Sequence, residues 1–166
     1  MKLIFGHDEA LAQWAASRIP GMTKDGFGPC RAIGVASGDS TDSELYASIV
    51  YHGFVDSENW RIMHISIAAR SPVWAAKGVI RALLSVPFEQ YKINKLYSIM
   101  SARNTRAIRF NKALGFKHET FLRHHFGQDH HGEVTYMLRP TYFLRYGGGR
   151  VQIGEKSGLL LLENAA

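Results

Sequence analysis

The stretch "NTRAIRFNKALGF", residues 104–116, opens with an asparagine, continues through basic side chains and closes on an apolar Gly-Phe step. Apolar residues recur at helical spacing and predict a buried face: Ala107, Phe110 and Leu114. Basic residues mark the opposite face: Arg106, Arg109 and Lys112. Gly115 is expected to end this helix because glycine tolerates the left-handed conformation of a C-terminal cap.

Outward from this helix, the hydrophobic patterns predict strands and helices in a regular order. Strands are predicted at residues 2–5, 30–37, 44–54, 60–69 and 95–101, and a closing hairpin at 116–126 and 132–140. Helices are predicted at 8–19, with Asp8 as cap, and at 77–90, where Pro87 should kink or end the helix. Residues 21–29 are Gly/Pro-rich and predict a mobile loop.

This order predicts an α/β layer with a mixed sheet. The three strands between residues 30 and 69 should form an antiparallel meander. Strands 60–69 and 96–101, joined by the helix at 77–90, should be parallel through a right-handed crossover.

Length and composition bound the organisation of the chain. With 166 residues and 46% hydrophobic content, it can build one well-buried core and not two ordinary domains. We expect a domain over residues 1–145 and a Gly-rich tail over 146–166 that packs, swaps or pairs with a neighbour. Cys30 is alone and is expected to be a small buried hydrophobe. The N-terminus does not resemble a signal peptide and no run matches a membrane span, so we expect a cytoplasmic protein without a membrane partner.

The formal charge of +6 suits a nucleic acid, an acidic partner or a phosphate-bearing ligand, and charge alone does not choose among them. Five histidines gather between residues 118 and 131. Adjacent histidines of a strand point to opposite faces and no cysteine joins them, so no metal site is expected.

A strand that leads through a Gly-containing loop into a helix presents unpaired N–H groups and a positive dipole end. The stretch "RSPVWAAKGVIRALL", residues 70–84, has this pattern. Gly78 would let the backbone approach a phosphate, with Lys77 and Arg81 to neutralise it. A purely structural turn remains an equal alternative.

Both segments together resemble the GNAT superfamily, the Gcn5-related N-acetyltransferases, over Trp60 to about Tyr142. "IAARSPVWAAKGVIRALL" is similar to the family's strand, pyrophosphate loop and helix. In "SARNTRAIRFNKALGFKHE" the family's marked positions fall in register: Asn104, Ala107, Leu114, Gly115, Phe116 and Glu119. The hairpin that follows is similar to the branch that acetylates ribosomal-protein N-termini.

The resemblance implies a mostly antiparallel α/β (α+β) sheet with a splayed parallel strand pair and helices on both faces. Acetyl-CoA would lie in that opening, with its pantetheine completing the main-chain pairing that residues 67–70 lose. The residues implied to bind it are Ile67, Ala68, Ala69, Arg70, Ala75, Ala76, Lys77, Gly78, Val79, Ile80, Asn104, Arg106, Ala107, Phe110 and Asn111. Two departures stand out: only Gly78 is standard among the loop's three marked positions, and Asn111 replaces a tyrosine that protonates the departing thiolate in many members.

The implied reaction is direct transfer of the acetyl group to a primary amine in a ternary complex, with the oxyanion held by an N–H near Ile67 or Ala68. His64, Ser66 and Glu119 are the candidates for the proton of the amine. His64 and Ser66 share a strand face by period 2. As alternatives, His64 is an ordinary sheet histidine and Glu119 an exposed strand-end carboxylate.

The acceptor is expected to be a protein N-terminus, a lysine or a small-molecule amine, between loop 21–29 and hairpin 126–133. The protein would be a monomer or homodimer without a metal. Two other functions stay open: a nucleic-acid-associated protein of the same fold, which the scattered basic residues do not favour, and a degenerate acyl-CoA-binding module.

Overall fold

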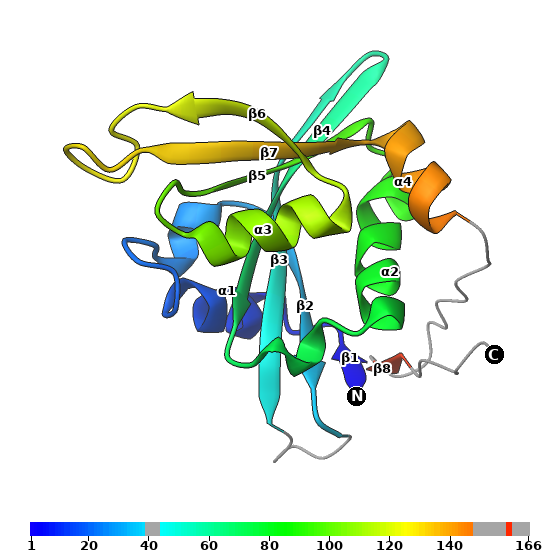
Figure 1. The fold of residues 1–166 in the computed structure, drawn as a ribbon. Helices are drawn as coiled ribbons and strands as arrows, with labels where there is room; N and C mark the ends of the chain where they lie inside the picture. The colour runs from blue at the N-terminus through cyan, green and yellow to red at the C-terminus, as the bar shows by residue number, and fades with distance from the viewer. Residues whose placement is uncertain (39–43, 148–158, 161–166) are drawn as a thin grey trace.

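A mixed β-sheet forms the centre of the computed structural model, which describes residues 1–38, 44–147 and 159–160 (Figure 1). Within these ranges the sheet has eight strands in the order β6-β7-β5-β4-β3-β2-β1-β8. Their bounds are β1 Lys2–Ile4, β2 Cys30–Ala36, β3 Leu45–Ser57, β4 Trp60–Ala69, β5 Lys95–Ser101, β6 Lys117–Leu122, β7 Gly132–Leu138 and β8 Leu159–Leu160.

The pairing of these strands confirms the predicted topology. β2, β3 and β4 form the antiparallel meander, and β7 pairs antiparallel with both β5 and β6. β4 and β5 are the parallel pair, joined through a helix as the sequence predicts. The sheet is therefore mixed and mostly antiparallel.

Helices cover both faces of the sheet, as expected. On one side, α1 (Asp8–Ala16) and the 3-10 helix η1 (Lys24–Phe27) pack with Val50 and Ala68; we call this side the α1 face. On the other side, α2 (Lys77–Ser85) and α4 (Arg139–Tyr146) pack with Ile49 and Ile65; we call this side the α2 face. α3 (Thr105–Leu114) also lies on the α2 face and crosses beside α2 in Figure 1.

The α3 segment folds as its sequence predicts. The side-chain oxygen of Asn104 accepts a hydrogen bond from the N–H of Ala107 and caps the helix. Gly115 ends it in the left-handed conformation, with φ of 103°. The buried face differs from the predicted one, because Ile108 and the polar side chain of Asn111 are buried, whereas Ala107, Phe110 and Leu114 are half-buried.

The N-terminal helix departs from the prediction at both ends. Asp8 is its first residue rather than its cap, because its carboxylate accepts the N–H of Ala32 and pairs with Arg31 across the layer. The helix ends at Ala16, before the expected stop at the Pro-Gly step. The loop that follows contains η1, whose Phe27 is buried in the core.

Two further elements were only partly anticipated. α2 ends at Ser85, and a π-helix over Val86–Gln90 follows it directly. This π-helix contains Pro87, so the expected interruption of the helix at that proline is confirmed. α4 was not predicted, because residues 132–140 were assigned as one strand. Pro140 lies in its first turn and Tyr142 is buried in the core.

The predicted tail, residues 146–166, lies mostly outside the described residues. Within it, Leu159–Leu160 pairs with Leu3 and Ile4 of β1 in the same chain. None of the helices in the described ranges has the length and apolar character needed to span a bilayer.

We predict that Gly115→Ala destabilises the protein by about 1–2 kcal/mol, because an alanine at positive φ is strained. The added Cβ would also approach Cδ of Arg145 to 3.0 Å. Urea denaturation followed by circular dichroism measures the change. Gly78→Ala is the matched control: its Cβ meets nothing within 4 Å, so helix propensity should leave the stability unchanged or raised.

Candidate active site

The parallel strands β4 and β5 pair over only part of their length. Their register contains Ile62 with Lys95, Met63 with Leu96 and His64 with Tyr97, and then stops. Beyond this point β4 continues along β3 to Ala69, and β5 continues along β7 to Ser101. The two strands therefore splay apart, which confirms the opening that the sequence implied. We call residues 65–69 of β4 the unpaired segment.

The direction of the main chain decides which groups of this segment are left without a strand partner. The N–H of Arg70 donates to the carbonyl oxygen of Tyr46 on β3, at 2.8 Å. Because residues of an antiparallel ladder alternate in direction, Ser66 and Ala68 also turn their main-chain groups toward β3. Ile65, Ile67 and Ala69 turn theirs toward the side that β5 has left. The sequence led us to expect that the main-chain groups of residues 67–70 lose their strand partners. This expectation is wrong for Ala68 and Arg70, whose groups face β3.

The N-terminus of α2 lies just after the unpaired segment in the chain. Its cap residue, Ala76, offers no side-chain hydrogen bond, and the first turn holds no acidic residue. The first hydrogen bond inside the helix runs from the N–H of Ile80 to the carbonyl of Ala76, so the preceding N–H groups point outward. Gly78 is exposed, with open space where a Cβ would stand. This end of α2 can receive an anion.

α3 flanks this helix end through an aromatic contact. The ring of Phe110 meets Trp74, the last residue of the 3-10 helix η2 (Pro72–Trp74) that precedes α2, edge-on at 5.5 Å between centroids. Asn104 is engaged in capping α3, while Arg106 is exposed on its outer side. The structure thus brings together the two segments that carried the sequence resemblance.

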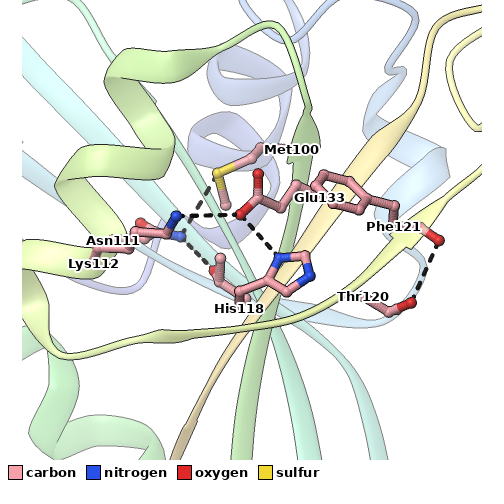
Figure 2. Close-up of polar contacts among 8 residues, drawn as sticks. Met100, Asn111, Lys112, His118, Thr120, Phe121 and Glu133 are labelled. Carbon is pink, nitrogen blue, oxygen red and sulfur yellow. Dashed lines mark hydrogen bonds and ion pairs between the residues drawn. The ribbon is translucent and has the colours of Figure 1, made fainter.

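Asn111 points from α3 into the sheet, as Figure 2 shows. Its amide nitrogen donates to the hydroxyl of Thr135 at 3.0 Å and lies 4.0 Å from the sulfur of Met100. Close by, the buried carboxylate of Glu133 contacts His118 at 3.1 Å and Lys112 at 3.8 Å (Figure 2). The Asn111 side chain is therefore held by its hydrogen bond to Thr135. Its amide has no acidic proton to give a thiolate.

The α1 face of the opening carries a cluster of rings. His64 lies between His52 of β3, at 4.2 Å between centroids, and Tyr97 of β5, at 4.7 Å. Phe27 of η1 meets His52 edge-on at 5.0 Å. Nε2 of His52 and the hydroxyl oxygen of Ser66 are 2.9 Å apart. His64 and Ser66 thus share one face, as predicted, and that face is turned toward α1 and η1.

Burial sets the charge of the imidazoles of His52 and His64. It lowers the pKa of His52 to about 4. Burial, together with the neighbouring His52 and His125, lowers the pKa of His64 to about 3, and Nε2 of His64 has no hydrogen-bond partner among the described residues. Both rings are therefore neutral at physiological pH.

Glu119 lies away from the opening. It belongs to the edge strand β6, with β7 and β5 between it and β4. Its carboxylate forms an ion pair with Lys95, at the end of β5 where the strands are still paired. The structure does not bring Glu119 to His64 and Ser66, which argues against its expected role with the amine proton.

The sequence missed three neighbours of this site: His52, Tyr97 and Phe27. Their places follow from the register of β3 and β5 against β4 and from the position of η1, which a single sequence does not reveal. The β6–β7 connection holds His124, His125, His130 and His131. His124 has φ of 53° there, and Nε2 of His130 is 3.3 Å from the hydroxyl of Ser101. Among the described residues no group of three potential ligands is placed to hold a metal ion.

Comparison with solved structures finds the same architecture in acetyltransferases. A chimera of Vibrio cholerae spermidine N-acetyltransferase SpeG with hSSAT matches 87% of this chain and 100% of its own, at 18% identity and a TM-score of 0.63. A structure of SpeG in complex with manganese ions matches 71% of this chain and 70% of its own, at 20% identity and a TM-score of 0.55. This chain has the fold of these acetyltransferases. The GNAT-type fold expected from the sequence is thus confirmed.

At this level of identity the likeness establishes the fold alone. No protein-family profile and no curated protein matches the sequence. The residues of this chain therefore carry the evidence for its function.

The buried histidines predict a loss of stability in acid. Because the folded-state pKa values lie below the ordinary 6.5, the unfolded chain binds more protons between pH 6.5 and pH 4. The free energy of unfolding is therefore highest above pH 6.5. It decreases as the pH falls, by about 2 kcal/mol for each histidine at pH 5. Urea denaturation at pH 7 and pH 5 measures it.

His64→Phe keeps the ring between His52 and Tyr97 and removes one titrating group, so it should reduce the loss between pH 7 and pH 5 by about half. His7→Phe is the control, since His7 is exposed. An equal loss in wild type and His64→Phe would contradict the assignment.

Proposed function

We propose that the protein is an N-acetyltransferase that moves the acetyl group of acetyl-CoA directly to a primary amine. The observation that carries the proposal is the end of pairing between β4 and β5 after His64 and Tyr97, next to the uncapped N-terminus of α2. A strand with unpaired main-chain groups and a helix end that accepts an anion suit a ligand with amides at one end and phosphates at the other. Acetyl-CoA is such a ligand.

The described residues fit this substrate in two places. The main-chain groups of Ile67 and Ala69, turned to the open side, can pair with the amides of the pantetheine arm. The N–H groups at the start of α2 can hold the pyrophosphate, with Gly78 leaving room and exposed Lys77 adding charge. The other proposed contacts lie around these groups and along α3: Ala75, Ala76, Val79, Ile80, Arg106, Ala107 and Phe110.

The chemistry requires few groups from the protein. A neutral amine attacks the thioester carbonyl, and the N–H of Ile67, which points to the open side, can stabilise the oxyanion. His64 and Ser66, on the α1 face of the same strand, are the groups that we propose for the amine proton. A thiol with a pKa near 8.5 leaves tolerably well without an acid, which is consistent with asparagine at position 111.

The acceptor of the acetyl group is a primary amine. We propose a protein N-terminus, a lysine or a small-molecule amine, approaching from the α1 face between η1 and the β6–β7 connection. The similar solved structures are spermidine N-acetyltransferases, which favours a small-molecule amine, whereas the closing hairpin favours a protein N-terminus. A cytoplasmic monomer or homodimer completes the proposal.

We predict that acetyl-CoA raises the melting temperature of the wild type and not that of Gly78→Trp. The indole would occupy the space that the pyrophosphate needs. Folding should be unaffected, because Gly78 is exposed and a Cβ added there meets no atom of the described residues within 4 Å beyond its chain neighbours. Differential scanning fluorimetry with acetyl-CoA, CoA and ATP measures the shifts. Ala10→Trp, an exposed position on α1 on the other side of the sheet, is the control and should keep the wild-type shift.

Activity is tested by following thiol release from acetyl-CoA with a panel of primary amines that includes spermidine, lysine and short peptides. Amine-dependent release supports an acetyltransferase. Stabilisation by acetyl-CoA without transfer to any amine would favour an acyl-CoA-binding module instead. Stabilisation by duplex DNA with a steep salt dependence would favour the nucleic-acid function.

A further inference from the structure

Ser66, one of the expected site residues, contacts a buried histidine that the sequence did not point to. His52 lies on β3, directly opposite His64, and only 7% of its surface is exposed. Its Nε2 atom is 2.9 Å from the hydroxyl oxygen of Ser66, which is half-buried. Ser66 lies in the unpaired segment, between Ile65 and Ile67, whose main-chain groups face the opening.

We propose that His52 is a positioning residue for the transfer reaction, accepting the hydroxyl proton of Ser66 while Ser66 accepts the proton of the attacking amine. This inference rests on the proposed function and deepens it, because it selects one proton path among the candidates. It requires the neutral tautomer of His52 that carries its proton on Nδ1, so that Nε2 is the acceptor.

The steps of the path balance. The amine nitrogen attacks the thioester carbon, and a C–N bond forms as the carbonyl π electrons move to oxygen. An amine proton passes to the Ser66 oxygen as the hydroxyl proton passes to Nε2 of His52. The tetrahedral intermediate then re-forms the carbonyl and breaks the C–S bond, and CoA leaves as a thiolate. The proton on His52 returns through Ser66 to that thiolate, which regenerates both side chains.

The position of Ser66 favours it over His64 for contact with the amine. His64 is the last residue of β4 that pairs with β5, and its ring is enclosed between His52 and Tyr97. Ser66 is two residues further along, where the strands have separated. In this arrangement His64 packs against His52, while Ser66 keeps its contact with His52 and directly precedes Ile67, where β4 no longer pairs with β5.

The environment of His52 suits the return of the proton. Burial holds the pKa of its imidazole at about 4, so the ring is unprotonated at neutral pH and, as a weak base, holds the transferred proton only in passing. The same low pKa makes the imidazolium a much stronger acid than a thiol of pKa about 8.5, so transfer to the thiolate is downhill. The path therefore supplies the proton that a tyrosine would give and that Asn111 does not.

Three variants separate this role from a structural one. Ser66→Ala removes the hydroxyl, and Ser66→Thr keeps it on a residue that suits a strand. His52→Gln keeps a hydrogen-bond acceptor for Ser66 but cannot take up a proton. His118→Gln is the matched control: His118 is also hydrogen-bonded, but its partner is Glu133 on the α2 face. The readouts are kcat and KM with an amine that the wild type acetylates, together with the melting temperature with and without acetyl-CoA.

We expect Ser66→Ala and His52→Gln each to lower kcat by about 10²-fold, the lower end for general acid–base catalysis. KM for acetyl-CoA and its thermal shift should not change. The double variant should lose no more than either single variant, because the two residues act as one path. Ser66→Thr, which keeps the hydroxyl, should recover most of the kcat that Ser66→Ala loses, whereas His118→Gln should keep the wild-type kcat.

Full activity in His52→Gln would overturn the inference while leaving the acetyltransferase function intact. Additive losses in the double variant would also overturn it, because they would mean separate roles. Absence of amine-dependent turnover in the wild type would instead overturn the proposed function and this inference together.

Discussion

The end of pairing between β4 and β5 is the constraint on which the site depends. Each strand keeps a partner on its other side, β3 for β4 and β7 for β5, so the two diverge without loss of the sheet. The main-chain groups of Ile65, Ile67 and Ala69 then need water or a ligand, because unpaired polar groups are costly when buried. The two helices that could hold such a ligand begin where these strands end, since α2 follows β4 and α3 follows β5.

Much of the fold could be read from local patterns. The alternation of apolar residues located the meander, and the glycine at 115 located the end of α3, because these signals depend on neighbours in the chain. Asp8 failed as a cap because a tertiary contact, with the N–H of Ala32, competed for its carboxylate. α4 was missed because Pro140 was assigned to the end of a strand, although proline is equally suited to the first turn of a helix.

The site was harder to predict because it depends on register and on long-range pairs. A regular hairpin about the turn after Ser57 would place Gly53 opposite His64, whereas an irregularity between His52 and Val55 shifts the register and brings His52 there instead. Gly53 has φ of 56°, which a single sequence does not reveal. Glu119 matched a family position, yet its ion pair with Lys95 follows from the three-dimensional order of the strands.

The short strand β8 has a consequence for handling the protein. β1 would otherwise be an outer strand of the sheet, with exposed main-chain donors and acceptors that can recruit a neighbouring molecule. Because residues 159–160 pair with Leu3 and Ile4, the chain shields this side with its own C-terminal segment. Shortened versions that stop ahead of residue 159 would uncover it and be prone to self-association at high concentration. Purification tags are therefore better attached through a spacer than in place of these residues.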